Sequence, residues 1–271
     1  MQSLPSPDIF RHSRRCRGNV MHDPLFEFLL RQGDNTLILS HRISEWCGHA
    51  PVIEEDIALA NIALDLLGQT QMWLGLAGEV EGMGRSSDDL AMLRDAWDFR
   101  NAILVERPNG HFGQTMMRQF LFDAYHVELL SELVNSSDAR IAAIAAKSLK
   151  EVEYHVERSA TTIIALGDGT QESHARMQAA LDDQWTFAGE LFETDAGDET
   201  LNETGIAPLP SSLRSRFDAR AKAVLGAATL AIPETSFAHS GGRSGKQHSE
   251  HLGHLLTQMQ WLQRAYPGAT W

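Results

Sequence analysis

The sequence predicts an all-α bundle of long antiparallel helices, and three observations support this. Apolar residues recur at three- and four-residue spacing along almost the whole chain of 271 residues. No segment alternates apolar and polar residues as a half-buried strand does. The helical segments are long and short turns join them, which places consecutive helices side by side in opposite directions. Because no shift in composition divides the chain, we expect one helical domain over residues 23–271.

Turn-forming residues mark the ends of the predicted helices. Gly48 and Pro51 end the first, the sequence RPNG at 107–110 precedes the fourth, and Gly167 and Gly169 end the fifth. The second helix carries acidic residues in its first turn, where the helix dipole favours them. The predicted helices span residues 24–48, 52–80, 90–106, 111–134, 138–167, 172–193, 209–230 and 248–266.

Composition argues against several classes of protein. The formal net charge of −13 disfavours a nucleic-acid or anionic-membrane binder, because phosphate contacts require clustered Lys and Arg. No apolar run approaches the roughly 18–20 residues of a membrane span. Only two cysteines occur, Cys16 and Cys47, which indicates the reducing cytoplasm. Residues 1–22 are basic but lack the apolar block of a secretory signal, so we expect a disordered N-terminal extension there.

The helix predicted over 52–80 is apolar nearly all round, which is typical of a central, buried helix. Asn61, Asp65 and Gln69 recur along it and are expected to point into packed surroundings. A buried, unpaired carboxylate costs several kcal/mol, so Asp65 needs a cation, a metal or a shared proton. Asn61, Gln69 and Arg42 are its candidate partners within the protein.

Four predicted helices each place an acidic residue at or near the interior: Glu45, Asp65, Asp123 and Glu151. This pattern resembles the carboxylate-bridged di-metal bundles, in which two helices each supply a Glu and two others each supply a Glu-x-x-His pair. A di-metal centre therefore requires a histidine three residues after two of the acids.

The required spacing is kept only once. His126 follows Asp123 at the right distance, but Gly68 follows Asp65, Tyr154 follows Glu151, and Val152 precedes the other candidate, His155. Glycine and valine cannot ligate a metal. The pattern therefore predicts a degenerate di-metal site, in which no metal is bound and the polar residues have a structural role: Glu45, Asp65, Asp123, His126, Glu151 and His155.

The chain also resembles a known family. The segments LRQGDNTLILSHRISEWCGHAPVIEEDIALANIALDLLGQ, LVERPNGHFGQTMMRQFLFDAYHVELL, AAKSLKEVEYHVERS and EHLGHLLTQMQWLQRAYPGATW occur in this order. Together they are similar to the C subunits of the multicomponent phenylacetyl-CoA epoxidase, a ring 1,2-monooxygenase. The resemblance covers roughly residues 27–271, and the blocks EWCGHAP and EHLG are specific only in combination.

The resemblance implies a ferritin-like bundle that pairs with a homologous catalytic A subunit in phenylacetate degradation. The A subunit would hold the di-iron centre, and an NADPH-dependent reductase subunit with flavin and iron–sulfur groups would supply electrons. The chain itself would be non-catalytic and bind no cofactor. The family also implies that two segments border the CoA-thioester site, at positions that correspond here to Asp98, Phe99, Arg100, Asn101, Glu199, Thr200 and Leu201.

Three hypotheses follow from these observations. The chain is expected to be a non-catalytic subunit that stabilises a di-iron oxygenase partner. Alternatively, it is an independent di-metal oxidoreductase with an unusual ligand set, or a helical scaffold whose buried polar groups only fix the helix register. Iron content, oxygen-dependent turnover and co-purification with a di-iron partner distinguish the three.

Overall fold

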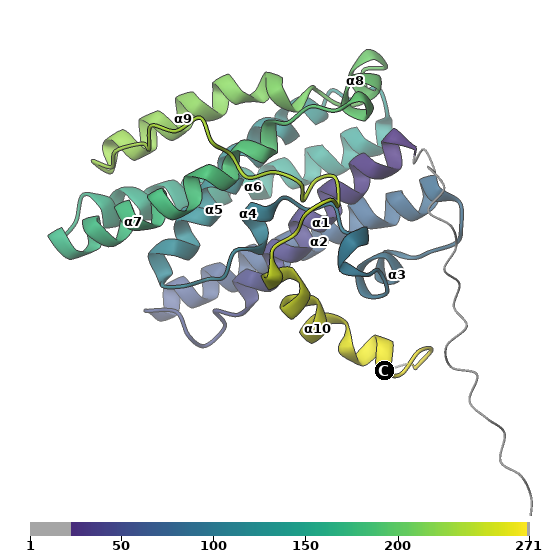
Figure 1. Ribbon diagram of the computed structural model, residues 1–271, viewed down its shortest axis with the longest axis horizontal. Helices are drawn as coiled ribbons and strands as arrows, with labels where there is room; N and C mark the ends of the chain where they lie inside the picture. Colours follow the sequence, from purple (N-terminus) through teal and green to yellow (C-terminus); the bar gives the residue numbers. More distant parts are fainter. Residues whose placement is uncertain (1–22, 270–271) are drawn as a thin grey trace, which may run out of the picture.

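The computed structural model describes residues 23–269, and these are helical with no strand (Figure 1). The predicted all-α fold is therefore confirmed, whereas the prediction for residues 1–22 lies outside the described residues. Six long helices form most of the bundle: α1 Pro24–Ser44, α2 Ile53–Glu81, α5 Phe112–Leu133, α6 Ala139–Gly167, α7 Gln171–Ala188 and α9 Arg214–Ala227. The C-terminal helix is α10, Glu250–Ala265. Shorter elements connect them: α3 Ser87–Met92, η1 Ala96–Asp98, α4 Ile103–Glu106, η2 Gly189–Phe192, α8 Ala196–Glu203 and η3 Pro210–Leu213.

Helices α1 and α2 form a closely packed antiparallel pair. The hydroxyls of Thr36 and Thr70 lie 2.8 Å apart across the helix contact. Gly33 allows this approach, because a Cβ at that position would lie 2.5 Å from Cδ2 of Leu74. Asp23 caps the N-terminus of α1, and its carboxylate accepts a hydrogen bond from the amide of Leu25.

Helices α5 and α6 form the second antiparallel pair, joined by the short segment 134–138. Figure 1 shows α7 and α9 on one side of this pair and α1 and α2 on the other. Helix α10 contacts α3 and η1, and the Gln260 amide donates there to the carbonyls of Ala91 and Arg94. None of the helices in residues 23–269 is sufficiently long and apolar to cross a membrane.

The single helix predicted over 90–106 is wrong, because three short elements occupy this region. Ser86 and Asp89 form a capping box that starts α3, and Asp95 and Asp98 form another around η1. Asn35 then accepts a hydrogen bond from the backbone amide of residue 102. Side chains that bond to local backbone groups compete with a continuous helix, and here they divide it.

The predicted central position of α2 is also wrong. Nearly all of α1 from Phe28 to Ile43 is buried, and so is almost the whole of α5. Helix α2 instead leaves one side open to solvent, with Ile53 67% and Leu64 65% exposed. Asn61 lies on this open side and not in packed surroundings. The central helices of the described chain are therefore α1 and α5.

Candidate functional site

Asp123 of α5 is the most deeply buried acid of the predicted site. Its two carboxylate oxygens accept hydrogen bonds from the Gln119 amide, at 2.6 Å, and the Ser159 hydroxyl, at 2.9 Å. Burial raises the pKa of Asp123 to about 6, although His155 and the two hydrogen bonds oppose this shift. Asp123 is thus held by neutral donors in a position where its charged form is disfavoured.

His155 of α6 bonds to Asp65 of α2 and so joins these two helices. Nε2 of His155 lies 3.0 Å from Oδ2 of Asp65. The histidine is fully buried, whereas the Asp65 side chain is 36% exposed. The partner of Asp65 is therefore His155, and not the candidates Asn61, Gln69 or Arg42.

Glu151 and Gln69 make a second link between α2 and α6, one turn from the first. The amide of Gln69 donates to Oε2 of Glu151 over 2.9 Å. Gln69 is buried and Glu151 is partly exposed. Together with the pair formed by Asp65 and His155, this contact fixes the register of two antiparallel helices.

His126 occupies an apolar part of the interior. Its ring packs against Phe122 with a centroid separation of 5.1 Å. Burial lowers the pKa of His126 to about 3, and the neighbouring His155 adds to this shift. His126 is therefore neutral at physiological pH, and within residues 23–269 its Nδ1 has no hydrogen-bond partner.

Glu45 lies outside this group, so the prediction that it faces the interior is wrong. Helix α1 ends at Ser44, and the Glu45 side chain is exposed at its C-terminus. There it accepts hydrogen bonds from Arg42, at 3.0 Å, and from Asn109, at 2.8 Å. The prediction placed Glu45 on the inner side of a helix that continued to Gly48, whereas the helix ends before Glu45.

The side chains of this core do not fit a di-metal centre. The oxygens of Asp123 and the facing atoms of Asp65 and His155 are engaged in hydrogen bonds within the protein. Among residues 23–269, no three His, Cys, Asp or Glu side chains converge so that they could hold a metal ion. The arrangement can hold α2, α5 and α6 together, and we call it the polar core: Asp65, Gln69, Gln119, Asp123, His126, Glu151, His155 and Ser159.

Two members of the polar core, Gln119 and Ser159, were not predicted from the sequence. Gln119 lies one turn before Asp123, and Ser159 lies one turn after His155. Polar residues at four-residue spacing from a buried acid or histidine are therefore the signal that could have identified them.

The first segment expected to border a CoA-thioester site, residues 98–101, packs against α1. Asp98 is exposed, while Phe99 is buried beneath the guanidinium of Arg94 at 4.4 Å. Arg100 donates from Nε to Glu27 over 2.7 Å. Asn101 is buried, and its amide donates to Oε1 of Glu106 in α4 over 2.9 Å.

The second segment, residues 199–201, belongs to α8. Glu199 and Thr200 are exposed and Leu201 is buried. Helix α8 reaches α1 through Asp198, which bonds to Arg31 at 3.0 Å and to Arg243 at 3.2 Å. Both segments are thus attached to α1.

Buried or half-buried arginines join these segments to α1. We call this group the arginine cluster; it comprises the cations and the acids that they contact, Arg31, Arg94, Arg100, Arg243, Glu27, Asp34, Asp195 and Asp198. Each of the four guanidinium groups is paired with a carboxylate. The arginines of this cluster therefore already have anionic partners inside the protein.

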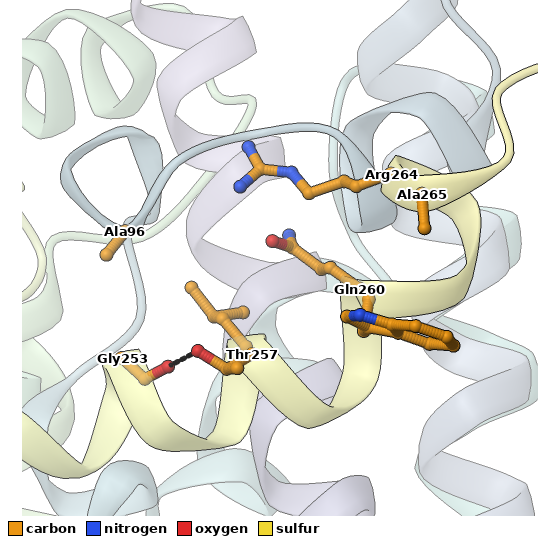
Figure 2. A pocket seen from close by; sticks show the side chains of 8 residues that line it. Ala96, Gly253, Thr257, Gln260, Arg264 and Ala265 are labelled. Carbon is orange, nitrogen blue, oxygen red and sulfur yellow. Dashed lines mark hydrogen bonds between the residues drawn. The ribbon is translucent and has the colours of Figure 1, made fainter.

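An open groove of ≈ 470 Å³ runs along α10 (Figure 2). Leu256, Thr257, Gln260 and Trp261 line it together with Ala96 from η1. The Thr257 hydroxyl is turned back onto the carbonyl of residue 253, and the Gln260 amide is bonded to backbone carbonyls. The groove therefore offers mostly apolar surface.

Comparison with known proteins agrees with the sequence resemblance. Residues 13–271 match the family model described as "Phenylacetic acid catabolic protein". Over 247 residues the chain is 47% identical to the C subunit of the 1,2-phenylacetyl-CoA epoxidase of Escherichia coli (strain K12), and the match covers 91% of this chain and 99% of that protein. The chain therefore belongs to the phenylacetic acid catabolic protein family.

Proposed function

We propose that this chain is a non-catalytic structural subunit of a di-iron phenylacetyl-CoA 1,2-epoxidase that acts in aerobic phenylacetate degradation. It stabilises a homologous catalytic A subunit and borders the acyl-CoA site of that subunit. The di-iron centre belongs to the A subunit, and NADPH, flavin and iron–sulfur groups belong to the reductase subunit. The proposal rests on the similarity to a protein named as the C subunit of a 1,2-phenylacetyl-CoA epoxidase.

The pairing within the polar core is the observation that supports a structural role. A metal ligand needs a lone pair aimed at the ion, with the other polar atoms oriented by hydrogen bonds. Here Asp65 is paired with His155, and Glu151 is bonded to Gln69, so these acids bridge helices instead of converging. The neutral donors around Asp123 likewise satisfy both of its oxygens.

A role beside the acyl-CoA site is supported by the way residues 98–101 and α8 are fixed. The arginine cluster holds both segments on α1, so their exposed residues are presented from a rigid base. Within residues 98–101 and 199–201, Asp98, Glu199 and Thr200 are the exposed members. We propose that they form part of the wall of the acyl-CoA site and leave the phosphates to basic groups of the A subunit.

Co-expression with the catalytic subunit tests the proposal. The complex should co-purify, its iron should follow the catalytic subunit, and the isolated chain should hold far less than one iron per molecule. Epoxidation of phenylacetyl-CoA should require both subunits. Stoichiometric, tightly held iron and oxygen-dependent turnover by the isolated chain would instead establish an independent di-metal oxidoreductase.

A further inference from the structure

The outer side of α2 carries a continuous apolar surface. Ile53, Ile57, Leu64 and Leu67 recur at helical spacing and share this side of the helix. Ile57 is 55% exposed, so these residues project well into solvent. Five of the twelve large exposed hydrophobic residues in the described part of the chain lie between Val52 and Leu67, which shows that they are concentrated here. We call this surface the α2 face.

The α2 face lacks the charges that a solvent-exposed helix side normally carries. Between Ile57 and Gln71 the exposed positions are apolar or amide residues, and Asp65 stands only at the margin. A helix that is apolar nearly all round is typically covered on every side. Within the described chain α2 is covered by α1, α3 and α6, and none of these helices covers the side that carries Ile53, Ile57, Leu64 and Leu67. An exposed apolar surface of this kind is typical of a site that binds a partner.

The polar core reaches the surface at this face. Asp65 is half-buried at its margin and bonds to the fully buried His155. A protein that covered the α2 face would shield this pair from water and thereby strengthen the interaction between its members. The α2 face thus borders the polar core at Asp65.

Charge argues against a second copy of this chain as the partner. Helix α2 contains six acidic residues and no Lys or Arg. In a two-fold symmetric dimer the same surface meets itself, so the only charged groups that α2 brings to both sides are carboxylates. Like charges across an interface are unfavourable. The partner that suits this surface has an apolar stripe flanked by Lys or Arg.

A groove of ≈ 510 Å³ opens on the α6 side of the first turn of α2, where Glu55 lines it. Phe112, Ala165 and Leu166 supply apolar lining, and the ion pair of Glu55 with Arg158 also lines it. Aromatic or aliphatic anchors that fill such pockets contribute most of the affinity of many interfaces. The groove therefore offers a place for one large side chain of the partner.

We propose that the α2 face, with the groove beside it, is the surface on which the catalytic subunit docks through a helix bearing basic residues. This inference rests on the proposed function, because that function supplies the partner. It adds the location of the interface and the chemistry of the facing surface, and it places Asp65 of the polar core at the margin of the contact.

The substitution Leu64→Arg tests the inference, since it removes an apolar contact and adds a cation opposite basic residues. Binding of the purified catalytic subunit, measured by isothermal titration calorimetry, should weaken roughly 100-fold. The matched control is Leu93→Arg, which changes a half-exposed leucine just after α3 and should bind like the wild type. Thermal melts check that both variants fold. The double substitution Ile57→Ala with Leu67→Ala replaces Leu64→Arg if that variant does not fold, and it should also weaken binding.

Three results would overturn the inference. Unchanged affinity of a folded Leu64→Arg chain would place the interface elsewhere and leave the proposed function standing. A wild-type chain that does not bind the catalytic subunit would overturn the proposed function itself. Light scattering that showed a dimer of the isolated chain, dissociated by Leu64→Arg, would identify a second copy as the occupant.

Discussion

The arginine cluster on α1 and the polar core between α2, α5 and α6 are both largely buried, but they neutralise their acids in different ways. Asp34 of the arginine cluster faces the guanidinium of Arg94, which donates to both carboxylate oxygens. Asp123 of the polar core receives side-chain hydrogen bonds from the uncharged groups of Gln119 and Ser159. One region keeps its charges inside the protein, and the other favours the neutral form.

This difference corresponds to the kinds of segment that each region joins. The arginine cluster attaches non-helical segments and the short helix α8 to α1, and the planar guanidinium can bond to several such groups at once. The polar core links long helices that apolar packing already holds together. Neutral hydrogen bonds are enough to fix their register, and they supply no counter-charge that would keep Asp123 ionised.

The largest effect should come from Arg94→Ala, which leaves Asp34 buried without its cation and with only the backbone amide of Arg100 as a donor. Breaking one side of a buried ion pair costs about 3–5 kcal/mol in the free energy of unfolding. Urea denaturation measures this loss. The control Arg176→Ala breaks the solvent-exposed pair with Glu172 and should cost no more than about 1 kcal/mol. Equal losses in the two variants would show that the arginine cluster contributes no more than a surface pair.

Asp123→Asn tests whether the polar core, unlike the arginine cluster, favours the neutral form of its buried acid. The pKa of Asp123 is raised to about 6, so the folded protein binds more protons than the unfolded chain between about pH 4 and pH 6. This group therefore makes the wild type lose stability as the pH rises through that range, by about 3 kcal/mol at 1.36 kcal/mol per pKa unit.

The measurement is the difference in unfolding free energy between Asp123→Asn and the wild type at pH 4 and at pH 8. The variant should gain relative to the wild type at the higher pH. Subtracting the two curves removes the contribution of His126, whose lowered pKa makes stability fall as the pH drops from about 6.5 toward 3. A difference independent of pH would show that Asp123 is charged and well compensated in the fold.

Ser159→Ala should cost less, because it removes one neutral donor from Asp123. A buried acceptor that loses its partner costs about 1–3 kcal/mol. The loss should be smaller below pH 4, where Asp123 is protonated, than at pH 8. Ser131→Ala serves as the comparison, since that hydroxyl bonds to the carbonyl of Val127 in its own helix. A loss that did not change with pH would separate Ser159 from the titration of Asp123.

Asp65→Asn should have the smallest effect. The amide still offers an oxygen to His155, and the side chain is partly exposed, so the expected loss is about 1 kcal/mol or less. Glu54→Gln, an exposed change in the same helix, provides the reference value for thermal unfolding. A loss of several kcal/mol would mean that the polar core depends on charge as the arginine cluster does.

The long helices could be predicted from the sequence because their apolar spacing is regular over many turns. Helices α5 and α6 begin and end within one residue of the predicted bounds. The region 90–106 could not, because its backbone follows local caps and a distant contact from Asn35. The spacing of apolar residues does not show where a side chain bonds to a backbone group and so interrupts the helix.

Part of the polar core was also predictable. Burial of Asp123 and His155 followed from their positions on apolar stripes. The prediction failed for Glu45, since one missing turn of helix moved it to the surface, and for the open side of α2. Periodicity shows that a helix side is apolar, but it cannot show whether the same chain or another protein covers it.

The bond from Arg31 Nε to the backbone oxygen of Arg243 spans 212 residues of sequence. At a synthesis rate of about 5–20 residues per second, roughly 10–40 s separate the appearance of these two residues on the ribosome. Helix α1 is thus made before the other described helices, yet its arginine cluster is completed only once residue 243 has been added. A chain that stalls before residue 243 presents an α1 whose cation lacks this acceptor, and such chains should be favoured targets of chaperones and proteases.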